Sequence, residues 1–97
     1  MNLNEAINSI VKEFGSGSYF DTHAVIDALH KHPYHEIYMH SFPENCNVNQ
    51  YHAIIGKKIG SLQNVTPVLI DGQPVKIKSF SIYEKIEDNQ LWRIKNE

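Results

Sequence analysis

The sequence predicts one small α+β domain in which helices precede a C-terminal antiparallel hairpin. The chain has 97 residues, a length that suits a single domain spanning residues 1–97. Apolar residues recur at helical spacing in the first part of the chain, up to about Leu62. After Pro67 the spacing changes to the alternation of apolar and polar residues that is typical of a half-buried strand.

The first helix is predicted close to the start of the sequence. Either Asn2 or Asn4 can cap it, and Gly15 can take the left-handed position after its last turn. A flexible turn is expected over residues 15–18, followed by a short extended segment over residues 19–20. The apolar stripe of this helix consists of Leu3, Ile7, Ile10, Val11 and Phe14.

The second helix is predicted to begin at Asp21 or Thr22, either of which can be its N-cap. Pro33 ends the regular helix because the residue before a proline is biased away from the helical conformation. Residues 34–42 fit either one or two further helical turns or an extended chain, and we favour the helix. The apolar face of the second helix is expected to carry Val25, Ala28, Leu29 and His32.

A third helix is predicted over about residues 48–62, with Asn47 as its N-cap. Its apolar stripe consists of Val48, Tyr51, Ile55, Ile59 and Leu62. The opposite face carries small or polar side chains, namely Gln50, Ala53, Lys57, Gly60, Ser61 and Asn64. Gly56 and Gly60 each weaken a helix by about 1 kcal/mol relative to alanine. This cost indicates a close approach, either by a partner or by a neighbouring helix.

Two strands of a hairpin are predicted at the end of the chain. The first covers residues 75–80 and follows a turn at residues 71–74. The second covers residues 90–95 and carries Trp92, which we expect to be largely buried. The tip of the hairpin is predicted at Glu87, Asp88 and Asn89, because their composition is typical of a turn. The alternating residues of the first strand are Val75, Ile77 and Ser79 on one face and Lys76, Lys78 and Phe80 on the other.

Helix, short strand, helix, helix and hairpin follow one another in the order of a winged helix. Residues 78–83 (KSFSIY) and 90–94 (QLWRI) resemble the C-terminal wing of small prokaryotic and phage winged-helix domains. Residues 20–26 (FDTHAVI) resemble the start of the second helix in these domains, and residues 51–56 (YHAIIG) resemble the centre of the third. The resemblance covers most of residues 19–95. It implies a cytoplasmic DNA-binding transcription regulator of bacterial or phage origin, with the third helix in the major groove and the wing over the backbone or minor groove.

The third helix offers side chains that such a regulator would use on double-stranded DNA. Amide side chains can hydrogen-bond to base edges, lysines can contact phosphate or guanine, and small residues permit close approach. The two strand lysines share one face, where they would contact phosphate or form the wet side of a half-buried hairpin. The predicted nucleic-acid-binding residues are Asn49, Gln50, Ala53, Lys57, Lys58, Ser61, Asn64, Lys76 and Lys78.

The charge distribution limits the classes of partner. The formal net charge of −2 argues against a strong non-specific nucleic-acid binder. Residues 1–47 hold six acids and two bases, residues 48–82 one acid and four lysines, and residues 83–97 four acids and three bases. An anionic partner should therefore meet the middle segment. The acidic first half favours an alternative function, a winged-helix protein–protein interaction module without nucleic-acid binding.

We predict a protein without catalytic activity, metal or cofactor. His30, His32 and His35 together with Cys46 match no standard zinc spacing, and they include a single thiolate. The glycine-containing residues 15–18 follow a helix and not a strand, so they do not form a phosphate-binding loop. We expect Cys46 to be an inert thiol.

A cytoplasmic location without membrane contact is expected. The sequence contains no apolar run long enough to cross a bilayer, and residues 1–5 lack the pattern of a signal peptide. A single cysteine fits a reducing compartment. Because one short domain rarely specifies a long DNA site, we also expect a homodimer or a protein partner. The first helix or residues 34–42 could supply that interface.

Overall fold

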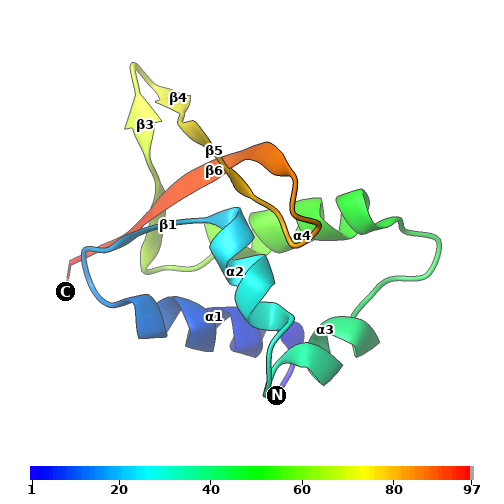
Figure 1. The fold of residues 1–97 in the computed structure, drawn as a ribbon. Helices are drawn as coiled ribbons and strands as arrows, with labels where there is room; N and C mark the ends of the chain where they lie inside the picture. Colours follow the sequence, from blue (N-terminus) through cyan, green and yellow to red (C-terminus); the bar gives the residue numbers. More distant parts are fainter. Residues whose placement is uncertain (97) are drawn as a thin grey trace.

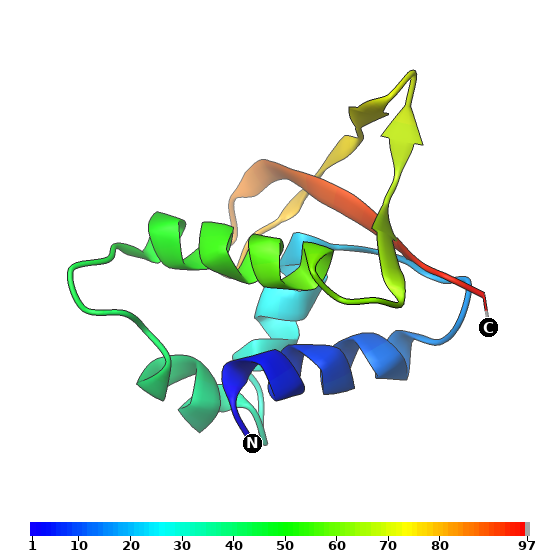
Figure 2. The ribbon, with the colours of Figure 1, turned by 180° about the vertical axis from the view of Figure 1, so that it is seen from behind.

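Four helices and a set of short antiparallel strands make up residues 1–96, the part of the chain that this computed structural model describes (Figures 1 and 2). The predicted α+β class is confirmed. The helices are α1 (Leu3–Phe14), α2 (Thr22–Leu29), α3 (His35–His40) and α4 (Val48–Gly60). The strands are β1 (Tyr19–Asp21), β2 (Val65–Pro67), β3 (Leu69–Ile70), β4 (Gln73–Pro74), β5 (Lys76–Phe80) and β6 (Ile86–Ile94). No helix within residues 1–96 has the length and apolar character needed to cross a membrane.

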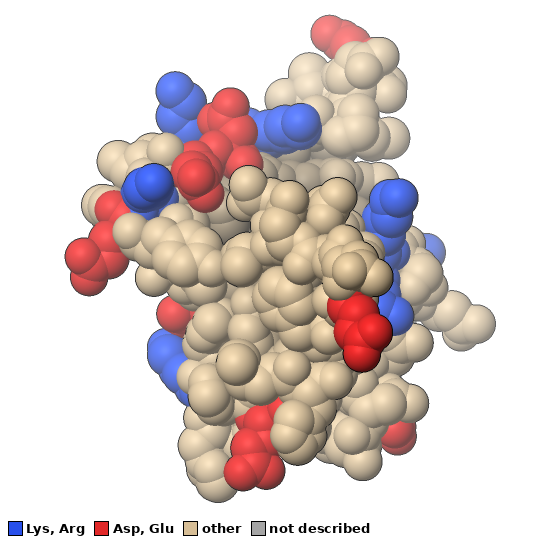
Figure 3. All heavy atoms as spheres, turned by 90° about the vertical axis from the view of Figure 1, so that its right-hand side faces the viewer, with Lys and Arg blue, Asp and Glu red and all other residues tan. Residues whose placement is uncertain are grey.

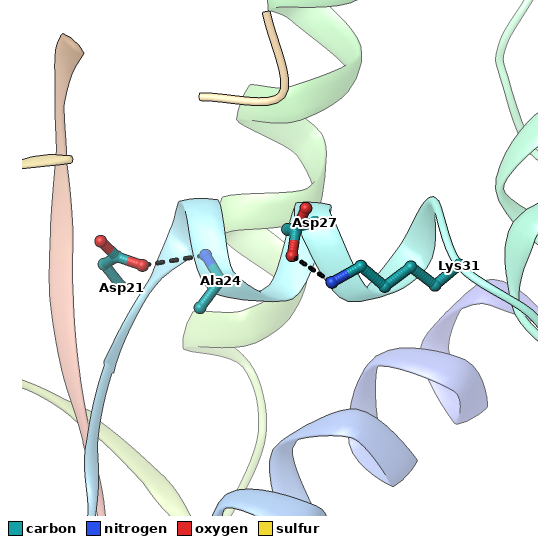
Figure 4. Close-up of polar contacts among 4 residues, drawn as sticks. All are labelled: Asp21, Ala24, Asp27 and Lys31. Atoms are coloured by element: carbon teal, nitrogen blue, oxygen red, sulfur yellow. Dashed lines mark hydrogen bonds and ion pairs between the residues drawn. The ribbon is translucent and has the colours of Figure 1, made fainter. Parts of the chain in front are cut away.

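The helices begin where side chains cap them. Asn2, and not Asn4, caps α1, and its side chain accepts a hydrogen bond from the backbone N–H of Glu5 at 2.9 Å. Asp21 caps α2, where its carboxylate accepts from the backbone N–H of Ala24 at 2.8 Å (Figure 4). Asn47 caps α4, as predicted. These local hydrogen bonds satisfy N–H groups that have no partner within the helix.

The core lies between the helices and one face of the sheet. Apolar stripes of α1, α2 and α4 meet there, together with Tyr38 from α3 and Trp92 from β6. Trp92 is only 5% exposed, which confirms its predicted burial. The fully buried side chains of largest volume are Tyr51, Ile7, Ile10, Leu29, Ile55, Ile59, Val11 and Val25.

The predicted helix between residues 34 and 42 is confirmed as α3, but α2 is shorter than predicted. Its last residue is Leu29, because the N–H of Lys31 bonds to the carbonyl of Ala28 and tightens the following turn. His32 then lies exposed. Its predicted place on the apolar face of the second helix is therefore wrong. An exposed ion pair between Asp27 and Lys31 spans the end of α2 (Figure 4).

β6 is the central strand of the sheet. It pairs with β1 on one side, where Phe20 lies opposite Trp92, and with β2 on the other, where Pro67 lies opposite Trp92. The first half of β6 pairs with β5, from Lys76 opposite Gln90 to Phe80 opposite Ile86. All these pairs are antiparallel.

β2 and β5 pair with successive parts of β6 and are separated by a projecting hairpin. The N–H of Val68 bonds to the carbonyl of Leu91 at 3.1 Å, and the N–H of Leu91 bonds to the carbonyl of Val75 at 2.9 Å. Both valines thus bond to the same residue of β6, and residues 69–74 are extruded between them. We call these residues the arm; they contain β3 and β4 and project away from the helices (Figures 1 and 2). Asp71 and Gly72 form its tip.

The predicted position of the hairpin tip is wrong. Glu87, Asp88 and Asn89 lie within β6, and the turn between β5 and β6 covers residues 81–85. The N–H of Ser81 bonds to the carbonyl of Lys85, and Glu84 takes the left-handed conformation at φ 59°. The polar composition of residues 87–89 reflects long-range contacts instead, since the buried Asn89 side chain donates to the carbonyl of Ile77.

Candidate binding groove

A groove of about 560 Å³ lies between α4 and the hairpin of β5 and β6, with part of α2 and Trp92 as its floor. The floor carries Thr22, His23, Ile26 and Trp92. The α4 wall carries Asn49, His52, Ala53, Gly56, Lys57 and Gly60. The hairpin wall carries Lys76, Ser81, Ile82, Tyr83, Glu87, Asp88, Asn89 and Gln90. This volume falls in the range of ordinary ligand pockets.

The start of α2 holds the hairpin wall in place. Asn89 accepts a hydrogen bond from the backbone N–H of His23 at 2.9 Å and donates one to Ser79 at 3.0 Å. His23 Nδ1 and Ser79 Oγ share a further hydrogen bond of 2.7 Å. Trp92 Nε1 donates to the hydroxyl of Thr22 at 3.0 Å. Five side chains from three elements thereby fix one wall of the groove relative to α2.

α3 supports the other wall through a cluster of aromatic side chains. The Tyr51 hydroxyl donates to the carbonyl of Tyr38 at 2.6 Å, and the Tyr38 hydroxyl and His52 Nε2 lie 2.8 Å apart. Burial raises the pKa of both tyrosines to about 12. Burial also lowers the pKa of His52, with His30 and His23 adding to this effect and Glu87 opposing it. The neutral form of His52 is therefore favoured beside the groove.

The two glycines of α4 have different surroundings. A β-carbon on Gly60 would lie 3.0 Å from Cη2 of Trp92, so the packing of Trp92 explains this glycine. A β-carbon on Gly56 would meet nothing closer than the Thr22 methyl group at 4.0 Å, which is ordinary van der Waals contact. Gly56 therefore lines the groove at a helix position where packing within the chain would also allow alanine.

Charges of both signs line the groove. Lys57 and Lys76 contribute positive charge, whereas Glu87 and Asp88 contribute negative charge. The face of the molecule in Figure 3 likewise shows acidic and basic groups beside one another and a largely uncharged centre. The net positive charge of residues 48–82 therefore does not form a uniformly positive groove, since two carboxylates of β6 line it as well.

The structure brings together four of the predicted nucleic-acid-binding residues. Asn49, Ala53, Lys57 and Lys76 all line the groove. Gln50 lies at the start of α4, where its side-chain oxygen accepts a hydrogen bond from the backbone N–H of Asn47. Its side chain serves as a helix cap in this arrangement.

The remaining predicted residues lie elsewhere. Lys58 donates a hydrogen bond to Asn4 at the start of α1. Ser61 and Asn64 line a separate depression beside α1. Lys78 lies opposite Asp88 in the pairing of β5 with β6. The predicted set therefore combined residues that lie in the groove with residues beside α1 and on β5.

Several groove residues escaped the sequence prediction, notably Ile82, Tyr83, Glu87 and Asp88 on the hairpin wall. They were missed because the hairpin turn was expected at residues 87–89. The Asp-Gly turn that the sequence does indicate, at residues 71–72, closes the hairpin of β3 and β4 and carries no information about the turn between β5 and β6.

No group of three or more His, Cys, Asp or Glu side chains within residues 1–96 is arranged to hold a metal ion. Comparison of the chain with protein-family models, with curated proteins and with solved structures finds no match.

Proposed function

We propose that this protein is a winged-helix module without catalytic activity that binds a segment of another protein chain in the groove. The order of its elements supports the winged-helix assignment, with α1, β1, α2 and α4 followed by the β5–β6 hairpin. α3 is an additional short helix in this arrangement.

Gly56 carries the proposal. Glycine inside a helix is destabilising by about 1 kcal/mol relative to alanine. Packing within the chain accounts for Gly60 but leaves Gly56 without a close neighbour. A partner whose backbone or side chain lies directly against α4 would account for Gly56, because only glycine allows such close approach. Ala53, one turn earlier, is also small and exposed.

The chemistry of the groove fits a peptide better than a nucleic acid. Ala53, Ile82 and the exposed ring of Tyr83 provide apolar surface, and lysines and carboxylates lie around it. A protein segment with apolar side chains and charges of both signs can match such a surface, as in helix-in-groove recognition. A nucleic-acid backbone is uniformly negative, so Glu87 and Asp88 would repel it.

Sequence-specific binding of double-stranded DNA by a transcription regulator is the second candidate. One observation favours it: Asn49, Ala53 and Lys57 of α4 line the groove together with Lys76 of β5. An amide, a small residue and two lysines are a set that could contact base edges and phosphates. The same surface contains Glu87 and Asp88, which places this function second.

Partner capture from an extract of the source cells tests both candidates. We would compare the wild-type protein with Ala53→Trp, which places a large side chain in the groove. Gln63→Trp is the matched control, because Gln63 is exposed and lines the depression beside α1. We expect the wild type and Gln63→Trp to retain the same protein after nuclease treatment and Ala53→Trp to lose it. Equal retention by all three proteins would contradict binding in the groove.

Selection from a random duplex library at two salt concentrations tests the DNA candidate separately. Enrichment of a defined sequence, lost in Lys57→Ala and Asn49→Ala, would favour DNA over a protein partner. A lysine that neutralises one phosphate contributes about one unit to the log–log salt slope, so Lys57→Ala should also lower that slope.

A further inference from the structure

The arm, residues 69–74, is an insertion that the sheet does not require. Val68 and Val75 both bond to Leu91, so β2 and β5 would follow one another along β6 without it. Removing the arm would leave one extra residue opposite Leu91, which is the arrangement of an ordinary β-bulge. The arm therefore serves something other than the pairing of β6.

The arm has a defined shape but exposes apolar side chains. Asp71 and Gly72 have φ values of 52° and 77°, which fit the tight type I′ turn of a two-residue hairpin. Leu69 is 52% exposed and Ile70 is 64% exposed. An isolated two-stranded hairpin is marginally stable in water. A projecting hairpin with exposed aliphatic side chains is thus suited to pack against another surface.

The groove has the chemistry that complements the arm. Gly60 touches Trp92, Lys57 lies one helical turn before Gly60, and Lys76 pairs with Gln90 two residues before Trp92. Both lysines therefore belong to the end of the groove nearest Trp92. Leu69 and Ile70 could pack against the small residues Ala53 and Gly60 and the edge of Trp92, and the carboxylate of Asp71 would meet the two lysines there.

We propose that the arm of one copy of this chain lies in the groove of a second copy, and the reverse, around a two-fold axis. This rests on the proposed function and identifies the protein partner as a second copy. The arm leaves the sheet next to Lys76 and points away from the helices, and so away from the α4 wall of its own groove (Figures 1 and 2). In an isologous dimer each contact occurs twice, which doubles the apolar area that is covered.

Sedimentation velocity over a range of protein concentrations tests the proposal. The wild-type protein is expected to form a dimer. Ile70→Lys in the arm and Ala53→Trp in the groove should each raise the dimer dissociation constant by at least about tenfold, because each removes both contacts. Met39→Lys is the control, since Met39 is similarly exposed on α3. It should dimerise like the wild type.

Mixing the two variants is the decisive experiment. Ala53→Trp keeps an intact arm and Ile70→Lys keeps an intact groove, so the mixture can form one of the two contacts. We expect a heterodimer that is weaker than the wild-type dimer but stronger than either variant alone. Thermal melting of each variant checks folding, and Lys57→Glu is a second groove variant in case Ala53→Trp is unstable.

Three outcomes would overturn the proposal. The wild type could remain monomeric at all concentrations, the dimer could be unaffected by Ile70→Lys, or the mixture could form no heterodimer. Capture of a different protein that Ala53→Trp abolishes would then show that the groove still binds a partner. If the wild-type protein also captured no protein that Ala53→Trp loses, the proposed function itself would be contradicted.

Discussion

Trp92 packs directly over Gly60, and a β-carbon at that glycine would lie 3.0 Å from Cη2 of the indole ring. The contact joins the end of α4 to the central strand β6 at one end of the groove. The Trp92 Nε1–H also donates to Thr22 at the start of α2. One side chain thereby sets the positions of two helices relative to the sheet.

The two glycines of α4 should respond in opposite directions to alanine. Gly60→Ala should lower the free energy of unfolding by about 1–2 kcal/mol, because the added methyl group overpacks against Trp92. Gly56→Ala should raise it by up to about 1 kcal/mol, because helix propensity improves without a close contact. Urea denaturation measures both. Destabilisation by Gly56→Ala would mean that packing within the chain, and not a partner, requires this glycine.

The core should depend strongly on Trp92 and Ile55. Both are buried, and truncating either removes apolar contact and leaves a cavity. We expect Trp92→Ala or Ile55→Ala to lower the free energy of unfolding by about 3 kcal/mol or more. Met39→Ala, at an exposed position, is the control and should stay near the wild-type value. Melting temperatures unchanged in both core variants would contradict their place in the core.

The turn of the β5–β6 hairpin should be improved by glycine. Glu84 has a φ of 59°, a conformation that is unfavourable for a residue with a β-carbon. Glu84→Gly is therefore expected to stabilise the protein by about 1 kcal/mol. Lys85→Gly, one residue later, should give no such gain. A lower melting temperature for Glu84→Gly would show that the glutamate side chain makes a stabilising contact there.

Acidification should weaken the fold through His52. Burial lowers the pKa of His52 below its ordinary value of 6.5, so the unfolded chain binds a proton there more readily than the folded chain. The contribution is complete above pH 6.5 and is lost as the pH falls toward the lower pKa of the folded state. Burial and His35 lower the pKa of His30 as well, so that residue adds to the effect.

Urea midpoints at pH 7.5 and pH 5.5 measure this effect. His52→Gln can keep a hydrogen-bonding group next to the Tyr38 hydroxyl but does not titrate. We expect its midpoint to fall less on acidification than that of the wild type. His40→Gln, at an exposed position, should fall as much as the wild type. An equal fall in all three proteins would exclude His52 as a source of the pH dependence.

Local signals predicted much of the fold. The apolar stripe of α1 and the cap Asn47 depend on residues a few positions apart, so they can be read directly from the sequence. The sequence offered two candidate caps for each of the other two helices, and the structure selects Asn2 for α1 and Asp21 for α2. The end of α2 was less predictable, because Pro33 marks only the last position that a regular helix can reach. The alternation in β5 predicted its strand and its exposed lysines.

The hairpin turn was mispredicted because it depends on long-range pairing. Asn89 is a typical turn residue, but its amide bonds to His23, which is 66 positions away in the sequence. Spacing along α4 likewise predicted an exposed face without showing that α1 lies beside Ser61 and Asn64. The groove depends on contacts between α2, α4 and β6, which no local pattern encodes.

Photo-crosslinking from Ala53 tests most directly whether the groove is a protein-binding surface. A benzophenone amino acid would replace Ala53 in one protein and Gln63 in a control, and both would be irradiated in nuclease-treated extract. We predict a discrete protein adduct from position 53, with residues 69–74 of a second copy as the attachment site, and none from position 63. No protein adduct from position 53, or identical adducts from both positions, would contradict protein binding in the groove.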